Sequence, residues 1–146
     1  MPRSEELLQL MIAAHALTRV AALDTRTETP AAQWRSLTLL RDHGPQRVGD
    51  LARLSRISQP GMTRLAGQLA DAGLIERTSD ATDSRVAILT VTPAGLSALD
   101  AWHDELRSAL APRFADLTDQ EWATLNSAAD ILTRKTGVEA PERKIR

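Results

Sequence analysis

The stretch ISQPGMTRL, residues 57–65, holds the polar side chains best suited to chemistry with a charged partner. Pro60 and Gly61 are poor residues for a helix interior, but a first turn tolerates them because its amides lack intrahelical partners. Ser58 is a suitable N-cap for such a turn. The apolar residues that follow share one face at 100° per residue: Met62, Leu65, Ala66 and Leu69. The pattern predicts a helix with one buried face and one polar face.

The first turn of this helix is small and carries no acid. Thr63 can bond a phosphate or touch a thymine methyl, and Arg64 can reach a phosphate or fork onto guanine O6 and N7. Such a helix end can enter the major groove, where its dipole favours phosphates. Residues 51–70 include Arg53, Arg56 and Arg64 but no acid. Arg53 and Arg56 are equally consistent with solvated surface charges.

A second helix and a hairpin flank this stretch. A short helix around Val48 and Leu51, followed by a turn at residues 55–57, completes a helix-turn-helix. After Gly73, the β-branched residues of 74–78 and 86–91 predict two strands on either side of a polar loop, SDATDSR. A hairpin in this position is a wing.

The wing offers a second set of contacts. Arg85 could lie in the narrow minor groove, where negative potential is focused. Asp83 has the wrong sign for DNA, so we expect it to pair with Arg85 or Arg77 and hold the wing tip in shape. The candidate DNA-binding residues are Ser58, Gln59, Pro60, Gly61, Thr63, Arg64, Gln68, Arg77, Asp83 and Arg85.

Four further helices surround this lobe. The first has Ser4 as its expected N-cap and ends near Asp24, and the second has Thr29 as N-cap and Pro30 as its first residue, ending at residues 43–45. Thr92 caps a long helix that Pro112 should end or kink. A capping box of Thr118 and Glu121 opens the last helix, and the charged PERKIR tail is expected to fray. The predicted fold is mainly α with a small β-hairpin wing.

Composition excludes several functions. The 146 residues carry a net charge of −1, so a nucleic acid must be met by a local patch. There is no cysteine, and His15, His43 and His103 have no ligand spacing, so we predict no metal site and no cofactor. No apolar run approaches 18 residues, which predicts neither a secretory signal nor a membrane span and makes the cytoplasm the default location. The sequence contains no glycine-rich phosphate loop and no nucleophile elbow, so we do not expect an enzyme.

The order of these elements resembles the MarR family of bacterial winged-helix regulators over nearly the whole chain. The matching residues are Gln33, Trp34, Leu37, Leu40, Asp50, Leu51, Ala52, Thr63, Arg64, Leu69, Gly73, Leu74, Ile75, Arg77, Asp83, Ser84, Arg85, Leu89, Thr90, Thr92 and Gly95. The resemblance implies a single domain, with dimerisation helices at 1–28 and 93–136, a DNA-binding lobe at 29–92 and a flexible tail at 137–146. It also implies double-stranded DNA as partner and a homodimer, often one that responds to a small molecule. Peroxide sensing through a cysteine is excluded here.

The terminal helices support a dimer independently of the resemblance. Their apolar residues exceed what one winged-helix core can cover, and the surplus includes Leu7, Leu10, Met11, Leu17 and Phe114. A second copy would bury this surplus and give a two-fold pair suited to a pseudo-palindromic operator, which a repressor would occupy.

Two alternatives stay open. The winged helix could bind protein instead of DNA. The resemblance places a small aromatic effector between the dimerisation helices and the lobe, with His15, Trp34, Arg35 and Trp102 as candidates, whereas Trp34, Trp102 and Trp122 all lie on apolar stripes and are first expected to pack in the core.

Overall fold

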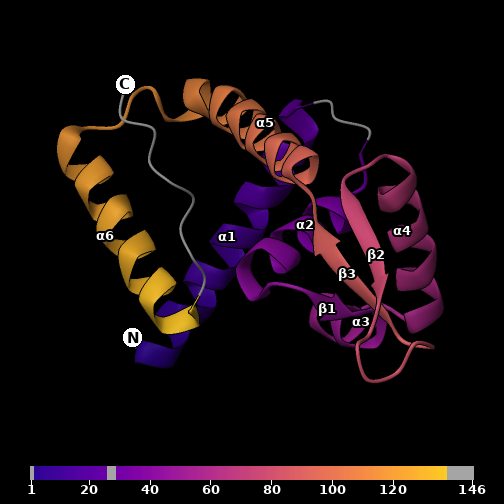
Figure 1. Ribbon diagram of the computed structural model, residues 1–146. Helices are drawn as coiled ribbons and strands as arrows, with labels where there is room; N and C mark the ends of the chain where they lie inside the picture. Colours follow the sequence, from indigo (N-terminus) through magenta and orange to yellow (C-terminus); the bar gives the residue numbers. More distant parts are fainter. Residues whose placement is uncertain (1, 26–28, 138–146) are drawn as a thin grey trace.

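The computed structural model describes residues 2–25 and 29–137 and has a winged-helix lobe with long helices at one end (Figure 1). The elements in chain order are α1 (Arg3–Thr25), α2 (Ala31–His43), β1 (Gln46–Arg47), α3 (Val48–Ser55), α4 (Gln59–Asp71), β2 (Ile75–Ser79), β3 (Ala87–Val91), α5 (Pro93–Leu110), the 3₁₀ turn η1 (Ala111–Phe114) and α6 (Asp119–Thr136). The predicted fold class, mainly α with a small β wing, is confirmed. The PERKIR tail lies outside the described residues.

Side-chain caps start the helices where the sequence predicted them. The Ser58 hydroxyl accepts the Gly61 amide at 3.1 Å, and the Thr92 hydroxyl accepts the Gly95 amide at 3.0 Å. Thr118 and Glu121 form the expected capping box. Each device satisfies first-turn amides that have no intrahelical partner. These three predictions are confirmed, as is the end of α5 just before Pro112.

Two predicted N-caps are wrong by one or two residues. Pro30, with φ −58° and ψ 138°, is extended, so it is the N-cap of α2 rather than its first residue, and no side chain caps that helix. Ser4 lies inside α1, because the carbonyl of Pro2 already accepts the Glu5 amide at 2.9 Å. In both cases a proline stands directly before the first helical residue, so the helix start lies away from the hydroxyl residue.

The three strands form one antiparallel sheet in the order β1–β3–β2. Arg77 of β2 lies opposite Leu89 of β3, and Gln46 of β1 lies opposite the same Leu89 on its other side. β1 was not predicted, since a strand of two residues has no alternating pattern to detect.

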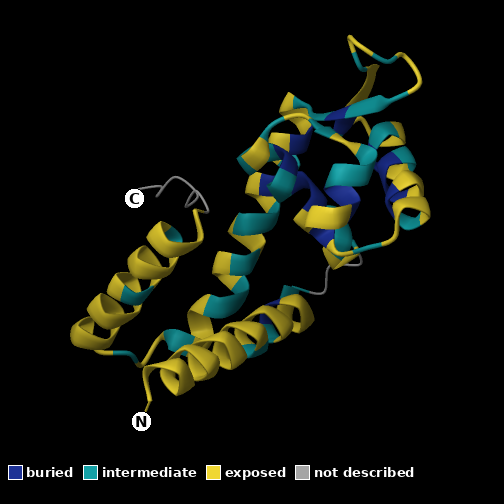
Figure 2. Ribbon diagram, turned by 90° about the horizontal axis from the view of Figure 1, so that it is seen from below, coloured by how far each residue is buried: buried dark blue, intermediate teal, exposed yellow. Residues whose placement is uncertain are grey.

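The buried core lies inside the winged-helix lobe. Its largest fully buried side chains come from α2, α3, α4, β3 and α5: Leu37, Leu40, Leu51, Met62, Leu69, Leu89 and Leu99. Figure 2 shows buried residues concentrated in this lobe, whereas α1 and α6 are mostly exposed. α1 buries only Ala21, and α6 buries no residue. The prediction that Trp122 packs in the core is therefore wrong for the single chain, in which Trp122 is 48% exposed.

α1 has an apolar content that the lack of a continuous apolar run did not reveal. By length and composition alone, this helix is long and apolar enough to cross a membrane. Polar residues, among them the consecutive Thr18 and Arg19, interrupt its apolar residues, so the sequence contains no long continuous apolar run. The exposed apolar residues of α1 are Leu7, Leu8, Leu10, Met11, Ile12, Leu17 and Leu23.

Candidate nucleic-acid interface

α4 has one buried face and one polar face, as predicted. Met62, Leu65, Ala66 and Leu69 are buried against the lobe. The candidate contact residues Ser58, Gln59, Pro60, Thr63, Arg64 and Gln68 are exposed, and Gly61 is half-buried. The helix therefore presents a continuous polar surface that begins at its N-terminus, where first-turn amides and the helix dipole favour an anion.

Local hydrogen bonds decide what two of these residues can offer. The Thr63 hydroxyl donates to the carbonyl of Gln59 at 3.0 Å, so its methyl group and its oxygen lone pair remain available to a partner. At Gly61, a β-carbon would stand 3.0 Å from the Ser58 oxygen. The glycine thus leaves room for the cap, in addition to keeping the backbone accessible.

Fewer of the arginines in residues 51–70 are available to an anion than the sequence suggested. Arg53 forms an ion pair with Asp50 at 3.3 Å, just outside the acid-free window. Arg64 is exposed, and no carboxylate of the described residues lies within 4 Å of it. Arg64 is the one basic residue of α4, and it is consequently available to bind a phosphate or a guanine edge.

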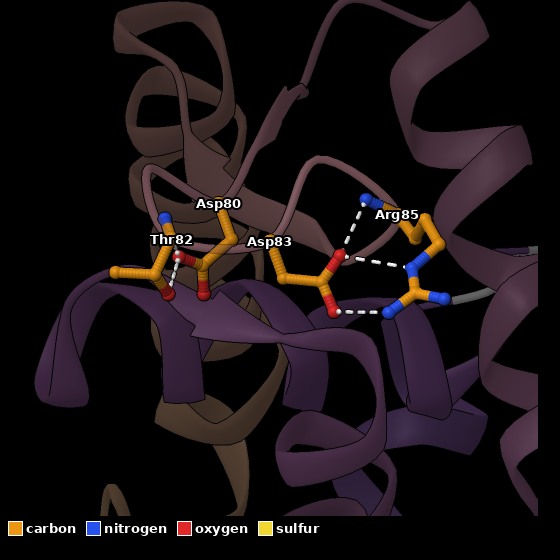
Figure 3. A network of polar contacts seen from close by, with 4 residues as sticks. All are labelled: Asp80, Thr82, Asp83 and Arg85. Carbon is orange, nitrogen blue, oxygen red and sulfur yellow. Dashed lines mark hydrogen bonds and ion pairs between the residues drawn. The ribbon is translucent and has the colours of Figure 1, made fainter.

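An ion pair between Asp83 and Arg85 fixes the wing tip. The sequence had left open whether Arg85 or Arg77 is the partner of Asp83. Arg85 donates from Nε to one Asp83 oxygen at 3.1 Å and from Nη2 to the other at 3.4 Å, while its backbone amide also donates to Asp83 at 3.1 Å (Figure 3). The bonds from Arg85 lower the pKa of Asp83 below its usual range. Arg77 is exposed on β2 and does not make this pair. Asp83 therefore orients the side chain of Arg85.

Three further residues, Asp80, Thr82 and Arg47, hold the wing and were missed by sequence reasoning. Asp80 accepts the Thr82 amide and hydroxyl, both at 2.9 Å, and pairs with Arg47 at 2.8 Å (Figure 3 shows Asp80 and Thr82). The bonds from Thr82, followed by the charge of Arg47, lower the pKa of Asp80. This pair ties the loop to β1. The only sequence signal was the Asp80–Thr82 spacing, which is typical of an Asx turn.

The four effector candidates are brought together only in part. Trp34 of α2 stacks on Trp102 of α5, with ring centroids 5.1 Å apart and planes 8° from parallel. Arg35 instead donates to the carbonyl of Ser55 at 3.4 Å. His15 is exposed on α1, with no hydrogen bond, ion pair or ring contact to the other three among the described residues. Both stacked tryptophans pack against the core, in line with the core-packing interpretation.

Two polar features lie near this stack. The Trp34 Nε1 and the His103 Nδ1 are buried without a hydrogen-bond partner in the described part of the chain. Burial, with added repulsion from Arg41 and Arg107, lowers the pKa of His103 and favours its neutral form. In residues 2–25 and 29–137, no three histidine, aspartate or glutamate side chains are grouped to hold a metal ion.

A separate open hollow of about 500 Å³ lies between the end of α1 and the middle of α5. Its lining includes Asp24, Asp104 and Glu105 but none of the four effector candidates. The carboxylates make this hollow a poor site for an organic acid.

Comparison with known proteins assigns the family. A family model described as MarR family matches residues 30–87. An HTH-type transcriptional regulator of Mycobacterium tuberculosis is 34% identical over 101 residues, which make up 69% of this chain and 71% of that protein.

Solved structures share the fold across most of the chain. RV1404 from Mycobacterium tuberculosis has a TM-score of 0.76 at 21% identity, with 97% of this chain and 99% of that chain covered. Wild-type MarR in its apo form from E. coli has a TM-score of 0.71 at 19% identity, with 85% and 93% covered. The expectation that the chain is not an enzyme is confirmed, because the relative at 34% identity is an HTH-type transcriptional regulator. The chain belongs to the MarR family of DNA-binding transcriptional regulators.

Proposed function

We propose that this protein is a sequence-specific, double-stranded DNA-binding repressor. One observation carries the proposal: the exposed face of α4 carries no acid from Gln59 to Ala70, and on it Arg64 has no carboxylate partner among the described residues. The wing adds an exposed arginine, Arg85, whose direction is fixed by Asp83. A cation held in place loses less conformational freedom on binding a phosphate than a free one does. The contact residues we propose are the ten predicted from the sequence, with Asp83 acting through Arg85.

We propose that the protein acts as a homodimer through its terminal helices. α6 carries Trp122, Leu125, Ile131 and Leu132 exposed, and α1 exposes a long apolar surface. The surface of a stable single chain rarely carries so much connected apolar area. The proposed division is therefore dimerisation helices at 1–28 and 93–136 and a DNA-binding lobe at 29–92. The two recognition helices would read half-sites about 10 bp apart in a pseudo-palindromic operator.

The apolar surface of α1 fits a second subunit better than a lipid bilayer. Glu5, Glu6 and Arg19 lie within the helix, and Asp24 near its end is ion-paired with Arg113 of η1 at 2.7 Å. Charges inside a membrane-spanning segment are costly. We therefore place the protein in the cytoplasm, where its DNA target lies.

A small aromatic effector is proposed to relieve repression. The Trp34–Trp102 stack and the unpartnered Trp34 Nε1 support a site at the junction of α2 and α5, since an aromatic ring with an acceptor group would complement both. His15 and Arg35 stay as candidates on the sequence alone. Thermal-shift screening of small aromatic acids tests this site, because a ligand that binds only the folded state must raise the melting temperature.

Selection of bound duplexes from a random library with the purified protein tests the main proposal. We expect enrichment of an inverted repeat, with affinity that falls steeply as salt rises because counterions are released. In transcription from a promoter that contains the selected repeat, added protein should reduce the transcript. If the winged helix binds protein instead of DNA, no duplex sequence should be enriched and no salt-dependent binding to duplexes should be seen.

A further inference from the structure

Arg56 adopts a backbone conformation that suits glycine. It lies in the turn between α3 and α4 with φ 57° and ψ 41°, and it is the one non-glycine residue with positive φ in residues 2–25 and 29–137. The left-handed region is disfavoured for a residue with a β-carbon, and a long side chain gains nothing there by itself. Such an outlier at a turn is a reason to look for a function.

The backbone imposes this conformation whatever the side chain is. The Arg56 amide donates to the carbonyls of Ala52 and Arg53, and the Ile57 amide donates to Ala52 at 3.1 Å, so the turn closes α3 with paired carbonyls. Arg35 adds a bond to the Ser55 carbonyl at 3.4 Å. None of these bonds uses the Arg56 side chain. Glycine would make the same turn with less strain, so the turn itself does not explain the arginine.

The guanidinium of Arg56 also has no carboxylate partner among the described residues, whereas four of the eight arginines of the lobe do. Arg41, Arg47, Arg53 and Arg85 each pair with an aspartate within 4 Å. Arg56 is exposed, and within the described ranges it has no carboxylate partner. An exposed and unpaired cation on a strained residue is available for an external anion.

We infer that Arg56 is a DNA-binding residue that contacts a backbone phosphate beside the groove entered by α4. The inference rests on the proposed function. The first helix of a helix-turn-helix crosses the DNA backbone while the second enters the major groove, so the turn that joins them lies at the groove edge. Phosphates rather than base edges line that edge, and a guanidinium binds them with charge-assisted hydrogen bonds.

Three substitutions separate this contact from the turn's structure. Arg56→Gly removes the charge and the strain together, so it should raise the melting temperature while weakening binding. Arg56→Asn keeps a residue that tolerates positive φ, and Arg56→Lys keeps the charge. Loss of one phosphate contact should reduce affinity by about fivefold for selected and random duplexes alike, and should flatten the slope of log K against log salt by about 0.9. Arg56→Asn should match Arg56→Gly in binding, and Arg56→Lys should restore most of the slope.

Arg53→Gln is the matched control, because Arg53 lies three residues earlier but is paired with Asp50. Arg53→Gln should flatten the slope of log K against log salt less than Arg56→Asn does. A glycine variant that is more stable but binds with the wild-type affinity and slope would overturn the inference and leave the proposed function intact. A loss confined to the selected sequence would also overturn it, because that result indicates a base contact. Absence of any DNA binding by the wild type would instead refute the proposed function.

Discussion

Arg113 of η1 and Asp24 of α1 form a two-bond ion pair although 89 positions separate them, with Nε to Oδ2 at 2.7 Å and Nη2 to Oδ1 at 3.3 Å. The pair joins the end of α1 to the segment that follows α5. It therefore helps to fix the orientation of α1 relative to α5, and this orientation positions the proposed dimer surface.

The Asp24–Arg113 pair predicts a pH-dependent contribution to stability. The hydrogen bond from Arg113 lowers the pKa of Asp24 in the folded state, so the pair contributes above the ordinary aspartate pKa of about 4 and is lost as pH falls through the lowered value. Asp24→Asn should cause a small loss of stability at pH 7, and the gap from wild type should close below about pH 4. Chemical denaturation at a series of pH values measures it. A gap that widened on acidification would contradict the assignment.

A tight backbone approach at Gly95 predicts a large effect of adding one methyl group. A β-carbon there would stand 2.1 Å from the carbonyl oxygen of Leu74 and 2.8 Å from Cγ2 of Val91. Because the closest atom is backbone, α5 would have to move away from the sheet. Gly95→Ala should lower the free energy of unfolding by about 3 kcal/mol or more.

The matched control is Gly67→Ala in α4, where no atom lies within 4 Å of the added carbon. This variant should gain about 0.5 to 1 kcal/mol from the better helix propensity of alanine. Denaturant titration of both variants gives the comparison. Equal effects at the two glycines would mean that the close approach to Leu74 does not constrain the helix.

The sequence predicted those features of the fold that depend on local chemistry. The caps at Ser58, Thr92 and Thr118 are local, since each hydroxyl serves an amide within a few residues. β1 and the Arg47–Asp80 pair depend on segments far apart in sequence, which no local pattern encodes. The choice of Arg85 over Arg77 as the partner of Asp83 likewise required the geometry of the loop.

The proposed DNA-binding site was likewise predicted from the sequence only in part. Which face of α4 is exposed followed from periodicity, but the neutralisation of Arg53 by Asp50 and the strain at Arg56 did not. The sequence suggested that Trp122 packs in a core, whereas the single chain leaves it half exposed. Helical periodicity shows that a face is apolar, and it does not say whether the same chain or a second copy covers it.

The wing supplies a prediction in which simple charge counting and geometry give opposite signs. Asp83→Ala removes a negative charge near DNA, which by electrostatics alone should strengthen binding. Because Asp83 holds both the Arg85 guanidinium and its backbone amide, we expect affinity for the operator to fall by about fivefold instead. Asp71→Ala, which removes an exposed acid at the end of α4, should leave affinity unchanged or slightly higher. Fluorescence anisotropy with a labelled duplex measures both.

Substitution of Arg64 should show whether its guanidinium reads a base or binds a phosphate. Arg64→Ala is expected to weaken binding to the selected site by about 1 to 3 kcal/mol and to random duplex by less, if the guanidinium forks onto a guanine. Arg19→Ala removes the same charge from an exposed position on α1 and should have no such effect. Equal loss on both duplexes would reassign Arg64 as a phosphate anchor.

The exposed leucines of α6 predict what holds two subunits together. Leu125 is 46% exposed, and α6 buries none of its residues, so a single chain should tolerate Leu125→Glu without unfolding. In the proposed dimer the new carboxylate would be forced into an apolar interface, where an unpaired charge is costly, so the subunits should separate. Light scattering should then give the mass of one chain, and operator affinity should fall because two linked half-site contacts become one. Leu54→Glu, at a leucine 38% exposed in α3 of the DNA-binding lobe, should stay dimeric. A dimer that survived Leu125→Glu would place the subunit contact on another surface.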